Sequence, residues 1–310
     1  MKKIFIDGKS GTTGLKILDR LNERPDIELV HISEEKRKDP AEKKKLMNQC
    51  DIVFLCLPDA AAIEAAELIE NPDTVVLDTS TAHRTSPNWA YGFPELSKEH
   101  FDRIRGSNRL TVPGCHASGF IALVYPLVEK GILPKDSLLT CHSITGYSGG
   151  GKKMIEAYEA KDRSSLLDAP RQYGLTQQHK HLKEMKAITG IDNFPIFCPI
   201  VSDFYSGMVV TVPLFSNSLA PGASLEDIKQ TYREKYKGPV VAFRDSMDEK
   251  GFLSASALSG KDSMEITVCG NEDRLLLVAR YDNLGKGASG AAIECMNVAL
   301  RLNLTYGLNL

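Results

Sequence analysis

The residue best suited to nucleophilic chemistry is Cys115, in the segment 112–119 (VPGCHASG). It lies between a Pro-Gly turn and the stretch 118–128, whose nearly continuous hydrophobicity predicts a buried helix. A thiol at a helix N-terminus lies near unpaired backbone N–H groups and the positive end of the helix dipole, and both lower the pKa of the thiol. A buried structural cysteine is the commoner role of this residue type. The position of Cys115 favours a reactive thiol instead.

Two histidines, His179 and His181, are candidate acid–base groups, because an imidazole near Cys115 could take its proton and later protonate a departing oxygen. On a helix, residues two apart point to different faces, so we expect only one ring to enter a site. On a strand they would share a face and could bind metal. No cysteine or carboxylate at ligand spacing completes such a site, so we predict no metal. From the residues alone, ordinary surface or core histidines are an equally good interpretation.

A glycine-rich turn follows the first predicted strand and precedes the first predicted helix. Its residues have the pattern G-x-x-G-x-x-G and are Gly8, Ser10, Gly11, Thr12, Thr13 and Gly14. Small residues at this position allow backbone N–H groups to approach a pyrophosphate. Any tight turn favours glycine, so the spacing is weak evidence. The strand-to-helix context makes a dinucleotide site the better interpretation.

The segment 33–38 (SEEKRK) follows the second predicted strand, where dinucleotide folds choose between NAD and NADP. Glu34 or Glu35 could bind a free ribose hydroxyl, whereas Ser33 and Arg37 could bind a 2′-phosphate. We expect the glutamates to face solvent and the cofactor to be NADPH. A charged loop that contacts nothing is the alternative.

Two further segments could bind an anionic ligand. The segment 146–153 (GYSGGGKK) contains three consecutive glycines before a helical pattern, and its backbone could take a phosphate or the nicotinamide end of a cofactor. Tyr147 and Lys152 in this segment, and Arg84 after the fourth strand, are candidate substrate contacts. A flexible turn and a surface arginine are the alternatives.

The order of predicted elements indicates an α/β fold with two parts. In the first third, short β-branched runs alternate with amphipathic stretches, which predicts a Rossmann-like parallel sheet. Later runs are longer and suit an α+β domain with a mixed or antiparallel sheet. The predicted strands are 4–7, 27–33, 51–57, 74–78, 194–215, 240–244, 264–270 and 275–281, and the predicted helices are 15–24, 41–49, 60–69 and 288–302.

Composition excludes several classes of protein. The 310 residues carry a formal net charge of −2 with scattered basic residues, which predicts neither a nucleic-acid nor a membrane partner. The seven cysteines are odd in number and show no C-x-x-C spacing, so we expect thiols in a reducing cytoplasm. No stretch reaches the length of a membrane span, and the N-terminus does not read as a signal peptide.

Five segments resemble the N-acetyl-gamma-glutamyl-phosphate reductase family, in its shorter subfamily, and follow one another in the order of that family. They are 8–14, 89–96 (WAYGFPEL), the Cys115 segment, 147–152 and 282–290 (DNLGKGASG). The resemblance runs nearly end to end. It implies the fold of the aspartate-semialdehyde dehydrogenase superfamily, with an NADP-binding Rossmann domain at 1–114 that is completed by a C-terminal helix at 286–310. It also implies a catalytic and oligomerisation domain at 115–285 and a homo-oligomer.

The resemblance further implies roles for single residues. Cys115 would attack a small-molecule acyl phosphate, and His181, the second histidine of the H-x-H motif, would be the acid–base. The nicotinamide site would be lined by Ser148, Gly149, Gly150 and Asn283. Two residues depart from the family pattern: Val112 replaces an Asn, and Glu294 replaces a Gln.

Two other functions remain open at this stage. An aspartate-semialdehyde dehydrogenase would recognise a free ammonium group rather than an acetamide. A dinucleotide-binding sensor would carry an inert Cys115.

Overall fold

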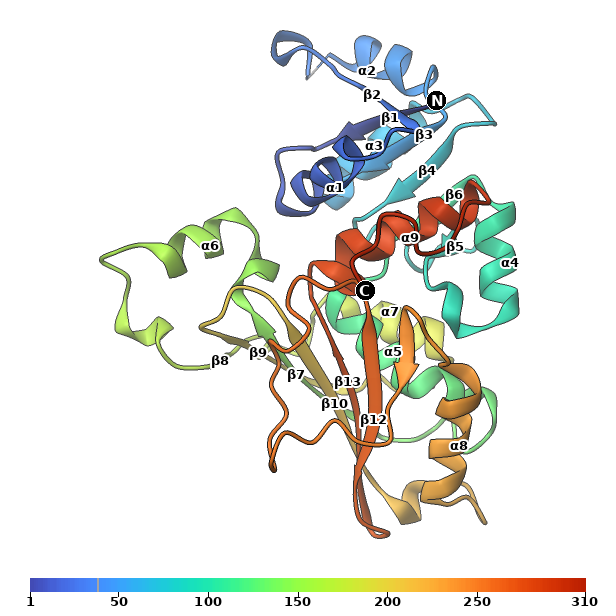
Figure 1. Ribbon diagram of the computed structural model, residues 1–310, viewed down its shortest axis with the longest axis vertical. Coiled ribbons are helices and arrows are strands. Elements are labelled where there is room, and N and C mark those ends of the chain that lie inside the picture. The colour runs from blue at the N-terminus through green and yellow to red at the C-terminus, as the bar shows by residue number, and fades with distance from the viewer. Residues whose placement is uncertain (38) are drawn as a thin grey trace. The chain divides into compact units, whose positions relative to one another are not determined.

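The computed structural model describes residues 1–37 and 39–310, which form two compact units. The first comprises residues 1–94, 98–113 and 288–308, and the second comprises 95–97, 114–287 and 309–310. Figure 1 shows the elements of each unit. No helix of the described residues has the length and apolar character needed to cross a bilayer.

The first unit contains a six-stranded parallel sheet in the order β2-β1-β3-β4-β6-β5. Its strands are β1 (Lys2–Asp7), β2 (Ile27–Val30), β3 (Ile52–Leu55), β4 (Val75–Asp78), β5 (Ala90–Tyr91) and β6 (Arg109–Thr111). Its helices are α1 (Thr12–Asn22), α2 (Pro40–Met47), α3 (Asp59–Glu67), α4 (Lys98–Gly106) and α9 (Gly290–Ala299), and η1 (Glu34–Lys36) is a short 3-10 turn. The short turn η2 (Pro94–Leu96) follows β5.

Both faces of this sheet are covered, which explains why its strands read as continuous apolar runs. On one face, Ile4 and Phe54 pack with Ile17 of α1, Ile104 of α4 and Met296 of α9. On the other face, Phe5 and Val53 pack with Met47 of α2 and Ala65 of α3. The predicted α/β class with a Rossmann-like sheet is confirmed.

The second unit contains a seven-stranded mixed sheet in the order β11-β12-β13-β10-β7-β9-β8. The pairs β7–β9 and β11–β12 are parallel and the others antiparallel. The strands are β7 (Thr140–Gly146), β8 (Arg171–Gln172), β9 (Ile196–Ser202), β10 (Met208–Phe215), β11 (Val241–Phe243), β12 (Met264–Gly270) and β13 (Arg274–Tyr281). The predicted run 194–215 is thus two strands.

The helices of the second unit are α5 (Cys115–Glu129), α6 (Lys152–Glu159), α7 (His181–Thr189) and α8 (Leu225–Lys235). Short turns are η3 (Tyr147–Gly150), η4 (Ser165–Leu167), η5 (Ser216–Ser218) and the π-turn η6 (Gly285–Ser289). Helix α5 packs on β10 and β13 and contacts α7 and α8 (Figure 1). Eleven of its fifteen residues are buried, as its uniform hydrophobicity predicts.

The turn between β1 and α1 depends on a glycine with a left-handed backbone. Gly8 has φ +84°, and a Cβ there would lie 2.2 Å from the Cys56 carbonyl oxygen. Gly11 has φ −75°, and a Cβ there would make ordinary contact, 3.5 Å from the Gly8 carbonyl oxygen. A side chain at position 8 would therefore be strained and would clash with the backbone, whereas one at position 11 would not.

We expect Gly8→Ala to destabilise the protein by about 2 kcal/mol or more, through left-handed strain and a backbone clash. Gly11→Ala is the matched control, because its backbone suits alanine. It should change stability by no more than about 1 kcal/mol, because the reduced flexibility of the unfolded chain offsets the lower preference for alanine at a helix N-cap. Thermal unfolding of both variants checks this, and equal losses would contradict it.

Candidate active site

Cys115 is the first residue of α5, with Gly114 at the N-cap. Its side chain is half-buried, and the cap has no side-chain hydrogen bond. The first turn of the helix carries no acidic residue. The helix thus directs the positive end of its dipole toward this thiol, as the position in the sequence predicts.

The first turn of α5, which begins with Cys115, is held by hydrogen bonds to its backbone. The buried Tyr281 hydroxyl donates to the Cys115 carbonyl oxygen at 2.5 Å and accepts from the Gly119 N–H at 3.0 Å. A Cβ at Gly287 would lie 3.1 Å from the Cys115 Cβ, closer than most Cβ contacts. The glycine-rich segment after β13 therefore approaches the nucleophile directly, and a side chain at Gly287 would have to displace it.

A buried carboxyl group, Glu184 of α7, reaches the same helix end. Its Oε1 accepts from the Gly114 N–H at 2.8 Å, and the residue is only 2% exposed. This carboxyl group takes one of the N–H groups at the start of α5. A negative charge there opposes a thiolate on Cys115, so the dipole alone does not set the charge of this site.

Three imidazoles and a tyrosine cluster beside this helix start. The His116 ring centroid lies 5.6 Å from that of His181 and 5.9 Å from that of His179, and the latter two are 4.7 Å apart. The Tyr173 ring lies 6.1 Å from His179. Both members of the H-x-H pair therefore face one cluster.

The prediction that only one of these two rings would enter a site rested on a premise that the structure does not meet. Its premise was a helix across both residues, but α7 begins at His181, and His179 lies in the preceding loop. The loop turns so that His179 folds back over His181, whose backbone N–H approaches the His179 Nδ1 at 3.3 Å.

Burial keeps part of this cluster neutral. It lowers the pKa of His116 to about 3, with a further contribution from His179. Burial also lowers the pKa of His179, helped by Lys180. The pKa of Tyr173 is raised by burial and by the negative charge of an ionised Cys115. Among the described residues, no group of histidines, cysteines and carboxylates could hold a metal ion.

The predicted nicotinamide contacts Ser148, Gly149 and Asn283 lie together. The buried Asn283 side chain donates to the Ser148 hydroxyl at 3.0 Å and accepts from the Gly207 N–H at 2.9 Å. A Cβ at Gly149 would lie 3.3 Å from the Asn283 amide nitrogen. At Gly150, a Cβ would clash with the side chain of Met154. Their role in cofactor binding stays a prediction.

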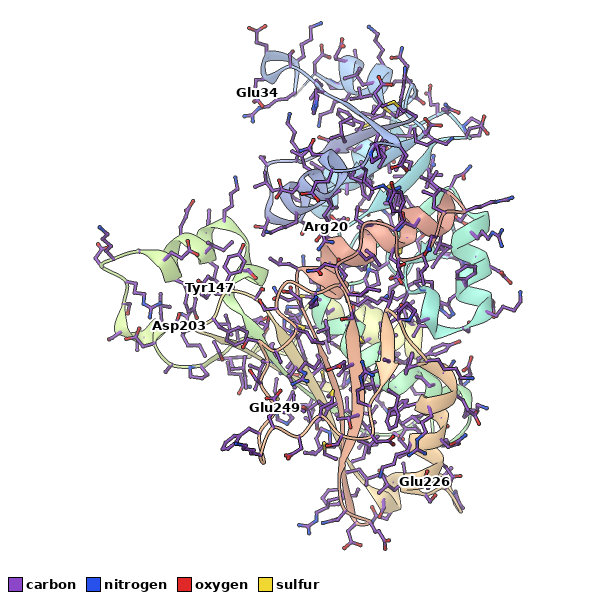
Figure 2. All side chains as sticks on the ribbon, viewed as in Figure 1. Arg20, Glu34, Tyr147, Asp203, Glu226 and Glu249 are labelled. Atoms are coloured by element: carbon purple, nitrogen blue, oxygen red, sulfur yellow. The ribbon has the colours of Figure 1, made fainter. Side chains whose placement is uncertain are left out.

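Tyr147 and Lys152 lie at either end of this segment. The Tyr147 ring stacks on Tyr158 at 4.7 Å, and its hydroxyl donates to the Glu159 carboxylate at 3.4 Å. Figure 2 labels Tyr147, which is the first residue of η3. Lys152 is exposed at the start of α6. Neither position tests the predicted substrate contact.

The loop after β1 in the first unit suits a dinucleotide phosphate. Helix α1 starts at Thr12 without a side-chain cap on Gly11, so its first N–H groups are open to an anion. The Thr12 hydroxyl is buried and has no hydrogen-bond partner among the described residues. Ser10 is exposed and Thr13 half-buried in the same turn, and Gly14 packs on the Gly8 carbonyl. These features fit the pyrophosphate of a bound cofactor.

The residues predicted to bind the 2′-phosphate of NADPH, Ser33 and Arg37, are exposed. Arg37 forms an ion pair of 3.2 Å with Glu34, and these side chains are 55% and 74% exposed. Figure 2 labels Glu34, which lies on the loop that follows β2. Ser33 and Glu35 are exposed too. An exposed ion pair of this kind contributes little free energy. Arg37 could therefore leave Glu34 and bind a phosphate at a small energetic cost.

Arg84 is buried rather than presented to solvent. Its guanidinium donates to the Val112 and Thr79 carbonyl oxygens, both at 2.9 Å. Val112, one of the two departures from the family pattern, packs its side chain in the apolar core. Glu294, the other, is fully buried in α9. The substrate role of Arg84 stays a prediction.

Sequence reasoning missed four site residues: His116, Tyr173, Glu184 and Tyr281. Two of them had a local signal. His116 follows Cys115 directly, and Glu184 lies three residues after His181, on the same helix face. Tyr173 and Tyr281 reach the site through strand pairing, which no local spacing reveals.

Known proteins resemble this chain along almost its whole length. Two domain profiles match: "Semialdehyde dehydrogenase, NAD binding domain" at residues 3–104 and "Semialdehyde dehydrogenase, dimerisation domain" at residues 115–283. N-acetyl-gamma-glutamyl-phosphate reductase 2 of Nostoc sp. is 44% identical, and the alignment covers 99% of both chains. The enzyme of Rhizobium meliloti is also 44% identical, over 96% of this chain and 98% of its own. The chain belongs to the N-acetyl-gamma-glutamyl-phosphate reductase family.

Solved structures of aspartate-semialdehyde dehydrogenases share the fold. One from Vibrio cholerae, complexed with ASA, has a TM-score of 0.71 at 14% identity, covering 97% of this chain and 98% of that one. One from Candida albicans with NADP has a TM-score of 0.63 at 18% identity, with the same coverage. At such identities the likeness concerns the fold alone. The family resemblance proposed from the sequence is confirmed.

The buried neutral His116 predicts a pH dependence of stability. Its pKa of about 3 in the folded protein lies below the ordinary 6.5 of the unfolded chain, so only the unfolded chain takes up the proton between these values. The stabilisation is complete above about pH 6.5 and falls by about 1.4 kcal/mol per pH unit below it. We expect His116→Phe to remove about 2 kcal/mol of the loss between pH 6.5 and 5.

Urea unfolding at pH 6.5 and 5 measures this difference. The variant is expected to be less stable at both values, so the change with pH is the quantity compared. Tyr173→Phe is the control, because it removes a hydrogen bond of His116 but no imidazole. The same pH dependence in wild type and His116→Phe would refute the assignment.

Proposed function

We propose that the protein reduces N-acetyl-L-glutamyl 5-phosphate to N-acetyl-L-glutamate 5-semialdehyde and phosphate, with NADPH as the reductant, in arginine biosynthesis. The observation that carries this is a thiol at the start of α5, beside an imidazole cluster, in a chain alignable over almost its full length with reductases of that name. We further propose that it acts in the cytoplasm, where thiols stay reduced.

In this proposal Cys115 is the nucleophile. His181 takes the thiol proton, and the sulfur attacks the carbonyl carbon of the acyl phosphate. The bond between that carbon and the phosphate oxygen breaks, and phosphate leaves with the electron pair. Cys115 then holds the acyl group as a thioester, which accepts hydride more readily than a carboxylate does.

NADPH, when bound, supplies a hydride to the thioester carbonyl carbon. As the carbon–sulfur bond breaks, its electron pair returns to sulfur and the aldehyde is released. The proton held by His181 returns to the Cys115 sulfur, which restores the thiol. His179, whose ring lies 4.7 Å from that of His181, is the alternative acid–base.

The two units divide this work. We assign NADPH binding to the first unit, through Gly8, Ser10, Gly11, Thr12, Thr13, Gly14, Ser33 and Arg37. The second unit carries the chemistry and the remaining cofactor contacts, Ser148, Gly149, Gly150 and Asn283. Arg84, Tyr147 and Lys152 are the proposed substrate contacts.

We also propose a homo-oligomer that forms through the second unit. Large apolar side chains are exposed on its sheet, on strands β7, β9, β10 and β13: Ile144, Ile196, Phe215 and Leu276. Ile144, Phe215 and Leu276 alternate with buried residues that face the core. A sheet face of this kind is typical of a subunit interface, and the matching profile is described as a dimerisation domain.

The alternative substrate, aspartate 4-phosphate, carries a free ammonium group. The likeness to aspartate-semialdehyde dehydrogenases concerns the fold, at 14–18% identity, and does not favour it. The other alternative, a dinucleotide-binding sensor, needs no reactive thiol. It therefore does not account for a cysteine at a helix start beside a cluster of imidazoles.

The reverse reaction tests the proposal directly. With N-acetylglutamate semialdehyde, phosphate and NADP, we expect reduction of NADP, and little with aspartate semialdehyde. Cys115→Ser should keep the fold and cofactor binding but lose nearly all turnover, because a hydroxyl is far less ionised than a thiol. Preference for aspartate semialdehyde, or substantial activity in the serine variant, would defeat the proposal.

Cofactor choice tests the loop after β2. Arg37→Ala should raise the KM for NADPH several-fold and barely change that for NADH, because it removes the partner of the 2′-phosphate. Glu34→Gln, which frees Arg37 from its ion pair, should have the opposite effect on NADPH. A wild-type preference for NADH would overturn the NADPH assignment and leave the role of Cys115 intact.

A further inference from the structure

A buried chain of hydrogen bonds runs beside the nucleophile. The His116 Nδ1 lies 2.6 Å from the Ser143 hydroxyl, and its Nε2 lies 2.6 Å from the Tyr173 hydroxyl. Ser143 is fully buried on β7, His116 is 3% exposed, and Tyr173 is half-buried after β8. Both ring nitrogens therefore have a partner that could donate or accept.

Counting protons decides the direction of this chain. A neutral imidazole has one N–H and one lone pair, so one hydroxyl donates to the ring and the other accepts from it. The hydroxyl that accepts keeps its own proton for a further partner. At the fully buried Ser143 a proton left over would be costly, whereas Tyr173 reaches toward solvent. Ser143 therefore donates to Nδ1, and Nε2–H donates to Tyr173.

Because the Tyr173 oxygen accepts a hydrogen bond from His116, its position is fixed and its own proton can be donated to another group. Burial and the charge of an ionised Cys115 raise its pKa, so the phenol keeps its proton while the nucleophile is charged. The Tyr173 ring also packs near His179, so the hydroxyl belongs to the cluster that contains the proposed acid–base groups. A fixed donor at such a point suits an oxygen on which negative charge develops.

We propose that His116 is a positioning residue, held as the Nε2–H tautomer by Ser143, which directs the Tyr173 O–H proton toward an oxygen of the acyl phosphate substrate. The kinetic part rests on the proposed function, whereas the tautomer does not. His116 itself neither touches substrate nor carries the transferred proton.

Nitrogen-15 NMR of histidine-labelled protein tests the tautomer without substrate. The His116 signals are assigned by their loss in His116→Phe. We expect a neutral ring at pH 7 with a protonated Nε2 and a bare Nδ1, and a shifted Nε2 signal in Tyr173→Phe. A charged ring or a protonated Nδ1 would overturn the proposal.

Kinetics test the positioning. Tyr173→Phe should lower kcat by roughly 10-fold to 100-fold with a smaller change in KM, as the loss of a transition-state donor does. His116→Phe should have a similar effect, and the double variant should lose no more than about threefold beyond the larger single loss. His116→Gln, whose amide can donate to Tyr173 and accept from Ser143, should recover part of the activity.

Tyr125→Phe is the matched control. Tyr125 lies on α5, and its hydroxyl donates to the Glu129 carboxylate at 3.1 Å in an exposed position, so its loss should leave kcat unchanged within about twofold. Full activity of Tyr173→Phe, or independent losses that multiply in the double variant, would contradict the positioning role. A wild-type protein inactive on the acetylated substrate would instead refute the proposed function, and the NMR result would still decide the tautomer.

Discussion

The placement of the first residue of α5 is the constraint on which the rest of the site depends. The Tyr281 hydroxyl ties the Cys115 carbonyl oxygen to the Gly119 N–H, which fixes the first turn of the helix against β13. Gly287 brings the segment after β13 into contact with the Cys115 side chain, where no larger residue fits without displacement. The apolar body of the helix then anchors this end in the core. A thiol on a flexible loop could not be aligned with both an imidazole and a carbonyl carbon.

Two groups at the start of α5 have opposite effects on the ionisation of the Cys115 thiol. The N-terminus of α5 favours a thiolate, whereas the buried Glu184 at the same end opposes one. His116, with a pKa of about 3, contributes no positive charge near neutral pH. In the proposed mechanism, His181 would hold the proton that the Cys115 thiol gives up.

Local sequence patterns predicted the elements that have a strong periodic or apolar signal, but not the helices α4 and α8 or the short strands β5, β6 and β8. The parallel sheet of the first unit, the helix behind Cys115 and the strand 264–270 follow directly from such runs. The start of α7 could not be predicted this way. Gln177 adopts a left-handed backbone with φ 57°, and its side-chain amide pairs with both backbone groups of Phe197. This pairing ties the loop that precedes α7 to β9. It depends on β9, which lies later in the chain.

The chain Ser143–His116–Tyr173 was beyond sequence reasoning for the same reason. Its members come from β7, α5 and the segment after β8, and only the sheet register brings them together. The dinucleotide loop is the opposite case, because its glycines, hydroxyls and helix start are consecutive in the chain. Sites built from one segment can be predicted from residues, whereas sites built across strands need the fold.

The most direct test of the account is to trap the acyl group on Cys115. The protein is mixed with N-acetylglutamyl phosphate in the absence of NADPH, quenched in acid, digested and analysed by mass spectrometry. The account predicts an N-acetylglutamyl group on the peptide that contains Cys115, bound as a thioester that hydroxylamine removes, and absent from Cys115→Ser. An unmodified Cys115 under conditions in which the enzyme turns over, or an acyl group on another residue, would contradict it.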